Sequence, residues 1–178
     1  LQKNSRDLFV TQCGMRIFDV ERVATQGGSL RCYATHIENE IYKETDALEK
    51  IIEEEIMEGL KETDTYDKFG EGAHEIKSGL LNIISAIKKE GGVIVGYGAP
   101  AKGNTLLNFC GIGRESIKYC IERTPFKFGK FTPGMHIPVV SDSVMEKDGV
   151  PDFYLLLIWN YLDAVLEREK EYRAKGGK

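Results

Sequence analysis

The sequence predicts an α/β protein, with a Rossmann-like, doubly wound and mainly parallel sheet flanked by helices. A helical segment and an antiparallel strand pair are expected to precede this sheet. From residue 93 onward, short apolar runs alternate with loops and helical stretches, which is typical of parallel βα units. A glycine-rich turn follows the first run. The last run, residues 153–159, is almost entirely apolar, as in strands covered on both faces.

The first expected element is a pair of strands, residues 15–23 and 29–36. Both runs approach apolar/polar alternation, and Gly27-Gly28 lies between them, which favours an antiparallel pair. Two strands cannot bury a core alone, so we expect them to complete a sheet whose other strands lie elsewhere. The chain begins at Leu1 rather than at a methionine. We therefore expect it to be part of a larger enzyme.

Residues 45–90 are expected to form helices. In the first stretch, apolar residues at helical spacing are separated by Glu and Lys. In the second, one helix face is predicted to carry Phe69, Ala73, Ile76, Leu80, Ile83, Ile84 and Ile87. Gly91-Gly92 is then expected to end the helix as a carboxyl-terminal cap.

The α/β unit is predicted to contain strands at residues 93–97, 117–121, 137–140 and 153–159. A helix is expected to open over residues 105–109, and a final amphipathic helix over residues 161–173. The predicted organisation is therefore a strand segment at 1–38, a helical connector or hairpin at 39–92, and a Rossmann-like domain at 93–178.

Composition excludes several classes of function. The net charge of −4 disfavours a nucleic-acid partner, which would require a basic surface. The longest apolar run, residues 154–159, is too short to span a membrane. The four cysteines are scattered, with no C-x-x-C pair, so we expect reduced thiols in a cytoplasmic protein and no metal site in this chain.

The strongest local signal is the turn that runs from Gly96 to Thr105. Glycines allow a tight turn and close approach of the backbone to a ligand, and the amino end of the following helix suits a phosphate. Gly96, Gly98 and Ala101 match the dinucleotide fingerprint, with Glu122 near the expected ribose position. A P-loop is rejected because Asn104 occupies its lysine position. A tight turn that binds nothing remains an alternative.

Two further segments are candidate parts of a ligand site. The loop at residues 122–136 is long for a compact α/β domain, and it combines basic residues with phenylalanines that could stack on a base or a sugar. Asn160 follows the last predicted strand, where an amide could bind a base or a sugar hydroxyl. His136 is the histidine best placed to bind phosphate or transfer a proton. A loop packed on its own aromatic residues, or a simple strand-end cap, would explain these residues equally well.

Together these motifs resemble the C-terminal domain of the sugar C-methyltransferases, enzymes that use S-adenosylmethionine to methylate nucleotide-linked keto-deoxy sugars. The resemblance lies in five segments that occur in the family's order: residues 27–31, 96–108, 122–138, 151–160 and 172–178. The sequence departs from the family pattern at Gln26, Glu122, Thr124 and Phe128. Because of these departures, the resemblance does not identify the nucleotide base or the sugar.

The resemblance implies a role in deoxysugar biosynthesis. The zinc-binding domain, the S-adenosylmethionine site and the catalytic residues would lie upstream of Leu1, and residues 1–38 would end the methyltransferase domain. This chain would bind no cofactor, would be inactive by itself, and would hold a pyrimidine diphosphate sugar. The expected substrate-binding residues are Tyr97, Gly98, Ala99, Lys102, Gly103, Asn104, Thr105, Glu122, Lys127, Lys130, His136 and Asn160. The upstream domains of the same polypeptide are the expected protein partners.

Two other functions fit parts of the sequence. An NAD(P)-binding oxidoreductase module would use the glycine fingerprint and Glu122, although Lys102-Gly103 and the long basic loop argue against it. A non-enzymatic interaction domain would use residues 45–90 as a helical hairpin that binds a partner. Binding of NADH and the oligomeric state would distinguish these functions from the first.

Overall fold

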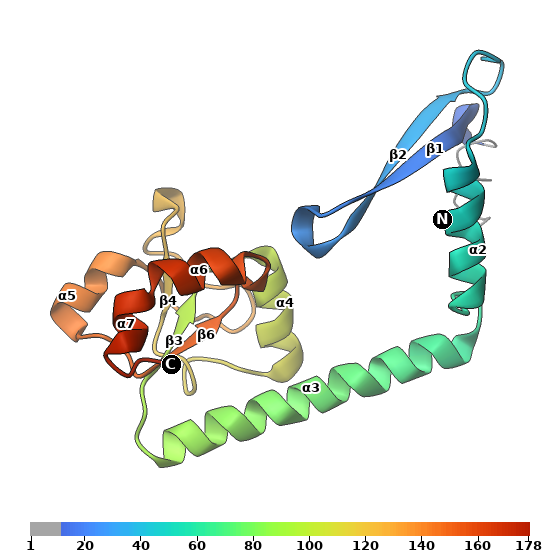
Figure 1. The fold of residues 1–178 in the computed structure, drawn as a ribbon. Helices are drawn as coiled ribbons and strands as arrows, with labels where there is room; N and C mark the ends of the chain where they lie inside the picture. The colour runs from blue at the N-terminus through green and yellow to red at the C-terminus, as the bar shows by residue number, and fades with distance from the viewer. Residues whose placement is uncertain (1–11) are drawn as a thin grey trace. The chain divides into compact units, whose positions relative to one another are not determined.

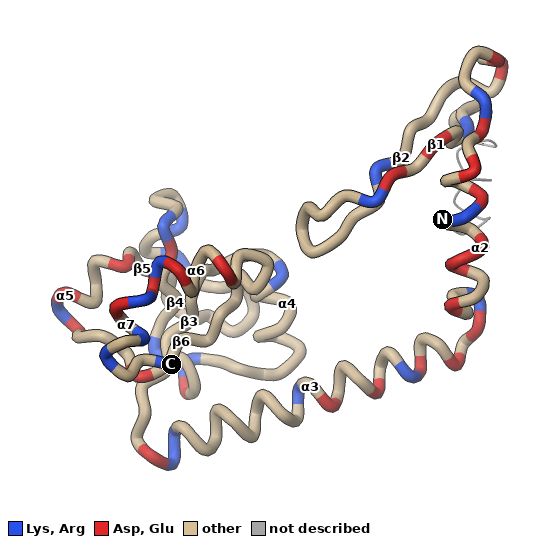
Figure 2. The backbone as a smooth tube through the Cα atoms, viewed as in Figure 1, with Lys and Arg blue, Asp and Glu red and all other residues tan. Residues whose placement is uncertain are grey.

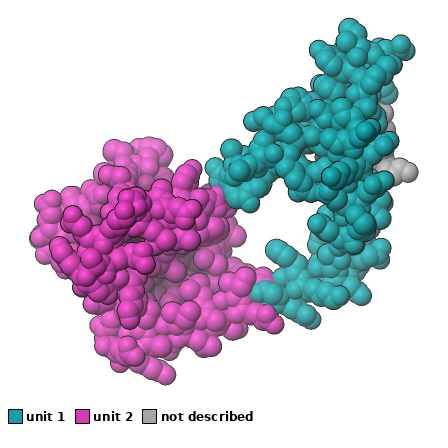
Figure 3. Space-filling model, viewed as in Figure 1, with its two compact units in different colours: residues 1–72 teal, residues 73–178 magenta. Residues whose placement is uncertain are grey.

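The computed structural model describes residues 12–178, so the first eleven residues of the predicted segment 1–38 lie outside the described part. The chain divides into two compact units, Leu1–Gly72 and Ala73–Lys178 (Figure 3). The boundary between them falls within one long helix, α3, Thr63–Lys89. Each unit is described by itself below.

The first unit contains the predicted antiparallel pair, β1, Met15–Val23, and β2, Ser29–His36 (Figure 1). A 3-10 helix, Thr25–Gly27, joins the two strands, and a bulge interrupts β1 between Ile17 and Asp19. Within residues 12–178 this sheet has only these two strands. The further strands expected elsewhere in a larger protein stay a prediction.

Helix α2, Asp46–Met57, supplies the apolar partner of the strand pair. Ile17 and Val20 of β1 pack with Leu48 and Ile51 of α2 in a small buried cluster. Thr45 precedes the helix, and its backbone N–H donates to the carbonyl of Phe18. Strand β1 therefore buries two of its apolar residues against a helix that follows the strand pair in the chain, whereas most of β2 is exposed.

Helix α3 confirms the predicted second helix, and its end is built as expected. Gly91 has a φ of 77° and its N–H donates to the carbonyl of Lys88, while the Gly92 N–H donates to the carbonyl of Ile87. This pair of bonds is the Schellman arrangement. Acidic residues prevail in the first half of the helix and basic ones at its end (Figure 2), which suits the helix dipole.

The predicted apolar face of α3 is covered only in part. Ile84 is buried in the core of the second unit, and Leu80, Leu81 and Ile87 pack against that core. Phe69, Ile76 and Ile83 are 78%, 65% and 59% exposed. A helix of 27 residues is about 40 Å long. It is therefore far longer than the four-residue strand β3, Ile94–Tyr97, that follows it.

The second unit is built on a four-stranded parallel sheet, which confirms the predicted fold class. Its strands are β3, β4 (Cys120–Glu122), β5 (Val139–Ser141) and β6 (Phe153–Leu156), in the order β5-β4-β3-β6. The chain moves outward from β3 to β4 and β5, and then returns to place β6 on the other side of β3. Ligands of open α/β sheets bind at the carboxyl ends of the strands, where the order reverses in this way.

Helices cover both faces of this sheet, as a doubly wound fold requires. On one face, Ile94 and Cys120 pack with Ile84 of α3 and Leu107 of α4, Ala101–Cys110. On the other face, Val95, Tyr97, Tyr119 and Ile121 pack with residues of α5, Met145–Asp148, and α6, Leu162–Arg168. The alternation of neighbours such as Ile94 and Val95 between the two cores follows from the two-residue period of a strand.

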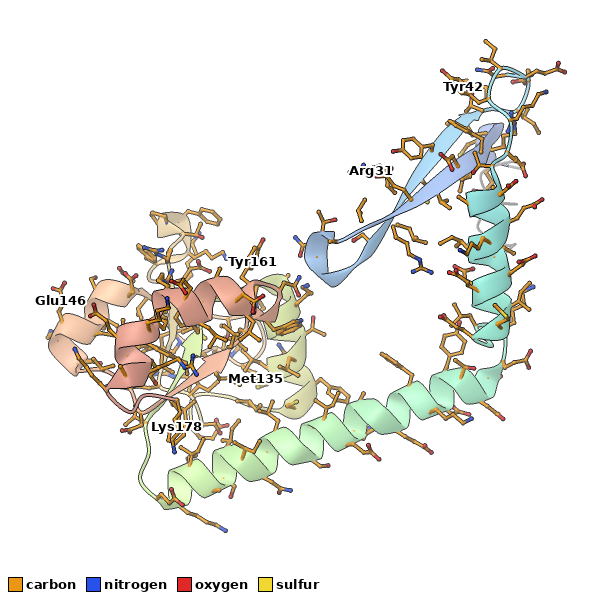
Figure 4. All side chains as sticks on the ribbon, in the orientation of Figure 1. Arg31, Tyr42, Met135, Glu146, Tyr161 and Lys178 are labelled. Carbon is orange, nitrogen blue, oxygen red and sulfur yellow. The ribbon has the colours of Figure 1, made fainter. Side chains whose placement is uncertain are left out.

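Several predicted boundaries were wrong. The strand expected at 153–159 ends at Leu156 and is only half-buried, and a 3-10 helix, Trp159–Tyr161, follows it. Strand β6 has one strand neighbour, β3, and the backbone of Lys178 (labelled in Figure 4) bonds to the opposite side of its first residues. Residues 153–158 are apolar because their side chains pack into the cores on both faces of the sheet. This packing continues past Leu156, where strand pairing stops.

Two predicted helices also differ. Helix α4 begins at Ala101, four residues before the predicted start, because Pro100 is its amino-terminal cap and proline readily precedes a helix. The single helix expected over 161–173 is divided at Glu169 into α6 and α7, Lys170–Ala174. Glu169 caps α6 through its N–H and accepts a hydrogen bond from Tyr97 on β3, so a tertiary contact accompanies the break.

Candidate functional site

The glycine-rich turn connects β3 to α4 through Gly98, Ala99 and Pro100. Gly98 has a φ of 85°, and a Cβ atom there would lie 2.6 Å from Cγ2 of Ile158, which follows β6. At Gly96 a Cβ would lie 2.5 Å from Sγ of Cys120 on β4. Gly98 is needed because the turn passes directly against the segment after β6, and Gly96 is needed because β3 lies against the side chain of Cys120 on β4.

A third glycine brings α4 close to the sheet. A Cβ atom at Gly103 would lie 2.8 Å from Cβ of Leu157, so the helix packs there without a side chain between. The dinucleotide fingerprint assigns this packing role to its third position, which is Ala101 in the sequence match. Ala101 is exposed at the first position of the helix. The close-packing position of this fold is therefore Gly103.

The amino end of α4 carries four of the predicted site residues. The N–H of Asn104 donates to the carbonyl of Pro100, so the amides of Ala101, Lys102 and Gly103 precede the first bond of the helix. The Lys102 ammonium lies 5.6 Å from the centroid of the Trp159 ring. Thr105 Oγ1 donates to the carbonyl of Ala101, and Oδ1 of Asn104 is buried with no hydrogen-bond partner among residues 12–178.

Glu122, at the end of β4, is the most heavily hydrogen-bonded of the predicted residues. Its Oε2 accepts from the N–H of Ala99 at 3.2 Å and from Nζ of Lys127 at 2.8 Å. Its Oε1 accepts from the N–H of Arg123 and from both the N–H and the hydroxyl of Thr124. The carboxylate thus joins the glycine-rich turn to the loop after β4.

The protonation of Glu122 follows from these bonds. Burial alone would raise the pKa of this carboxyl. Hydrogen bonds from Lys127, from the N–H of Arg123, from Thr124 and from the N–H of Ala99 outweigh burial and lower the pKa to about 2. Glu122 is therefore an anion paired with the Lys127 cation at neutral pH.

The rest of the long loop folds back on itself and on α4. Backbone bonds link Gly129 and Lys130 with Val139, and Thr132 with Ile137, so the loop is a narrow hairpin. Asn108 of α4 donates from Nδ2 to the carbonyl of Pro133. Met135, labelled in Figure 4, packs against the core that α4 helps to form.

Lys130 and His136 both lie in the hairpin after β4. The Lys130 ammonium lies 5.5 Å from the centroid of the Phe126 ring, within its own loop. His136 is exposed, and with a φ of 52° it lies in the tight end of the hairpin. Glu122, Lys127 and Ala99 are brought together instead.

A cavity of about 120 Å³ lies at the carboxyl edge of the sheet. All four strands contribute to its wall through residues at or just after their carboxyl ends, and α6 adds one more residue. The lining residues are Tyr97, Gly98, Ile121, Glu122, Arg123, Asp142, Ile158 and Arg168. The cavity therefore lies where the strand order predicts a ligand.

Four of these lining residues, Ile121, Asp142, Ile158 and Arg168, were not among the residues that the sequence predicted for the site. Asp142 lies two residues after the predicted strand 137–140, and that position was a usable signal, whereas Ile158 lies inside the predicted strand 153–159. Arg168 lies on a helix far along the chain, and nothing in the local sequence marks it. The Arg123 and Asp142 side chains approach to 3.7 Å across the cavity wall, so the wall carries both signs of charge.

Tyr97 joins the cavity to the core behind it. Only 3% of Tyr97 is exposed, and its ring packs edge-on against Tyr154 with the centroids 5.1 Å apart. Its hydroxyl donates to Oε1 of Glu169 at 2.8 Å and accepts from the Arg168 guanidinium. The hydroxyl of Tyr97 thus bonds to α6 and to the residue that ends it.

A larger open groove, of about 1070 Å³, lies at the opposite edge of the same sheet. It is lined by Gly92 and Asp152, which precede β3 and β6, and by residues of α7 and the segment after it. The predicted ligand-binding loops are at the other edge, so we assign the candidate site to the smaller cavity and the adjoining end of α4.

Over residues 12–178, no group of three or more His, Cys, Asp or Glu side chains is arranged to hold a metal ion. The four cysteines are unpaired thiols, with Cys13 and Cys32 exposed and Cys110 and Cys120 buried. Of the helices in the described part of the chain, none combines the length and the apolar character needed to cross a membrane.

Comparison with known proteins agrees with the order of motifs along the chain. Residues 24–178 match the model of a family described as the C-methyltransferase C-terminal domain. The protein called C-methyltransferase NovU, from Streptomyces niveus, is 33% identical over 165 residues. The match covers 93% of this chain but only 39% of that relative's length. This chain belongs to the C-methyltransferase C-terminal domain family.

Proposed function

We propose that this chain is the substrate-holding portion of a C-methyltransferase that acts on a nucleotide-linked keto-deoxy sugar. The main support is the position of the amino end of α4 beside a cavity at the carboxyl edge of the sheet, where the strand order reverses. The backbone N–H groups in the first turn of a helix, together with the positive end of the helix dipole, suit a diphosphate.

The proposed diphosphate contacts are the backbone of the turn from Gly98 to Gly103 and the Lys102 ammonium. Asn104 and Thr105 lie in the same helical turn, and Lys130 and His136 are second choices from the hairpin. Tyr97 and Asn160 are the proposed contacts to base or sugar. The aromatic ring under Lys102 supports its role, because a stacked lysine is held near the helix start.

In the proposed reaction, S-adenosylmethionine would supply the methyl group. The catalytic general base that removes the proton beside the sugar ketone would belong to other parts of the protein. The contribution of this chain would be to hold the diphosphate and the base of the nucleotide, which places the sugar carbon and lowers the entropic part of the barrier. By itself the chain would not methylate a substrate. The proposed division remains 1–38, 39–92 and 93–178.

The dinucleotide alternative has less support. A carboxylate that binds ribose needs a free acceptor at the end of the second strand. The two oxygens of Glu122 already accept five hydrogen bonds from within the protein. Its lowered pKa reflects the same bonds.

Calorimetric titration of the chain with TDP, UDP, CDP, NADH and S-adenosylmethionine tests the proposal. We expect one pyrimidine nucleoside diphosphate to bind, and Lys102→Ala to weaken that binding at least tenfold. Lys118→Met is a matched control, because Lys118 pairs with Asp148 near the amino end of β4. Tight NADH binding would favour the oxidoreductase module. Binding of S-adenosylmethionine by this chain would contradict the proposed division of labour.

A further inference from the structure

The backbone of Ala99 is held at both its N–H and its carbonyl by one ion pair. The Ala99 N–H donates to Oε2 of Glu122 at 3.2 Å, and the Ala99 carbonyl accepts from Nζ of Lys127 at 3.1 Å. Glu122 and Lys127 are themselves joined at 2.8 Å. Ala99 of the glycine-rich turn, Glu122 at the end of β4 and Lys127 of the following loop thus form a closed ring of hydrogen bonds just before Pro100 and α4.

Neither charged group of this pair is turned freely toward solvent. The Glu122 and Lys127 side chains are 13% and 31% exposed. The remaining oxygen of Glu122 is occupied by Arg123 and Thr124. A carboxylate in direct contact with a diphosphate would also repel it, whereas a carboxylate neutralised by a lysine does not. The geometry therefore favours an internal role for both residues.

We propose that Glu122 and Lys127 are positioning residues: they fix the backbone on both sides of Ala99, and through it the orientation of the first turn of α4, for phosphate binding. This inference rests on the proposed function. It changes the role expected of both residues from the sequence, where they were candidate substrate contacts.

The glycine-rich turn needs these hydrogen bonds because its own sequence leaves its backbone conformation free to vary. Gly98 can adopt many backbone conformations, since it has no Cβ. Helix α4 begins two residues after Ala99, so a rotation of the backbone at Ala99 changes the direction of the N–H groups in its first turn. Holding donors in place before the ligand arrives removes an ordering cost from binding.

Removing one charge at a time distinguishes a positioning role from a direct electrostatic effect on nucleoside diphosphate binding. Glu122→Gln removes a negative charge near the proposed phosphate, and Lys127→Met removes a positive one. If the two residues act only through their charges, the first variant tightens nucleoside diphosphate binding and the second weakens it. If they position the turn, both variants weaken binding. We expect a fivefold to tenfold loss in each.

The test uses calorimetry with TDP, UDP and CDP on the whole chain, with Lys118→Met as the control for the loss of one lysine–carboxylate pair. Glu122→Asp is a second variant that keeps the charge but shortens the side chain by one methylene. We expect it to weaken binding as well, and unchanged binding would overturn the inference. Tighter binding by Glu122→Gln would overturn it too. The double variant Glu122→Gln/Lys127→Met should lose no more than either single variant, because the pair acts as one unit.

Amide hydrogen exchange distinguishes failure of this inference from failure of the proposed function. We expect Glu122→Gln and Lys127→Met to speed exchange at Ala99 and in the first turn of α4, and to leave the amides of β3 unchanged. If the wild-type chain binds no nucleoside diphosphate, the proposed function fails and the exchange result alone decides whether the pair fixes the turn. Unchanged exchange in both variants would refute the positioning role.

Discussion

Asn108 and Gly134 approach so closely that a Cβ atom at position 134 would overlap with Oδ1 of Asn108. Asn108 lies on α4, and Gly134 lies in the hairpin after β4, with a φ of 79°. The adjacent carbonyl of Pro133 accepts a hydrogen bond from Nδ2 of Asn108 at 3.0 Å. This contact attaches the long loop to the helix whose amino end forms the proposed phosphate site.

Gly134→Ala should therefore be strongly destabilising. The left-handed backbone costs a residue with a Cβ about 1–2 kcal/mol, and overpacking against Asn108 adds about 1–3 kcal/mol. Gly129→Ala is the control, because Gly129 has a similar φ of 73° but nothing within 4 Å of the added atom. Urea unfolding should show the larger loss for Gly134→Ala. Equal losses would mean that the Asn108 contact contributes nothing.

Substitution by alanine should change the unfolding free energy in opposite directions at two helical glycines. Gly79 in α3 has open space where a Cβ atom would lie, so Gly79→Ala should stabilise the protein by about 0.5–1 kcal/mol. Gly103 in α4 would place its Cβ 2.8 Å from Leu157, so Gly103→Ala should destabilise it by about 1–3 kcal/mol. Thermal unfolding of both variants measures the difference. A stabilised Gly103→Ala would contradict the close packing of α4 on the sheet.

The stability of the protein should depend on the ionisation of Glu122. Its pKa is about 2 in the folded protein, against an ordinary value of 4.5, so the unfolded chain binds the proton more readily. The resulting stabilisation is present above about pH 4.5 and is lost as the pH falls toward 2. With allowance for solvent screening it amounts to about 1–3 kcal/mol.

Urea unfolding between pH 2 and 7 tests this dependence. The difference in unfolding free energy between wild type and Glu122→Gln should be largest at neutral pH and should shrink toward pH 2. A difference that stays constant across this range would show that the carboxylate is not stabilised by its five hydrogen bonds.

The hydroxyl of Tyr97 should contribute more to stability than that of Tyr154. Tyr97 bonds to Glu169 and to the Arg168 guanidinium, so Tyr97→Phe leaves partly buried charged groups without this partner. We expect a loss of about 1–2 kcal/mol. Tyr154 donates to the Met145 sulfur, a weak acceptor, and Tyr154→Phe should cost less. Chemical denaturation of both variants provides the comparison, and an equal loss would argue against the Glu169 contact.

Much of this fold was predictable because its signals are local. Apolar runs separated by turns placed all four parallel strands near their true positions, and Gly91-Gly92 placed the end of α3. Boundaries were less predictable, because burial and strand pairing end at different residues. The apolar run after Phe153 continues to Trp159, whereas the strand ends at Leu156.

The candidate site was predictable only in outline. Its location followed from the rule that loops at the carboxyl ends of parallel strands meet at one edge, and the cavity lies there. The partners of individual residues did not follow. Arg168 reaches Tyr97 across 71 positions of sequence, and no local pattern encodes such a contact.

The order of strands and helices, the glycine-rich turn and the family of the chain could be inferred from the amino acids alone, because each depends on residues that are close together or in fixed order. The folded arrangement was needed to learn that Gly103 is the close-packing glycine, that Glu122 and Lys127 bind the N–H and the carbonyl of Ala99, and that Phe69 of α3 stays exposed. Those outcomes depend on which segments become neighbours in space. The strand order β5-β4-β3-β6 sets the distances within the second unit only when the chain has folded.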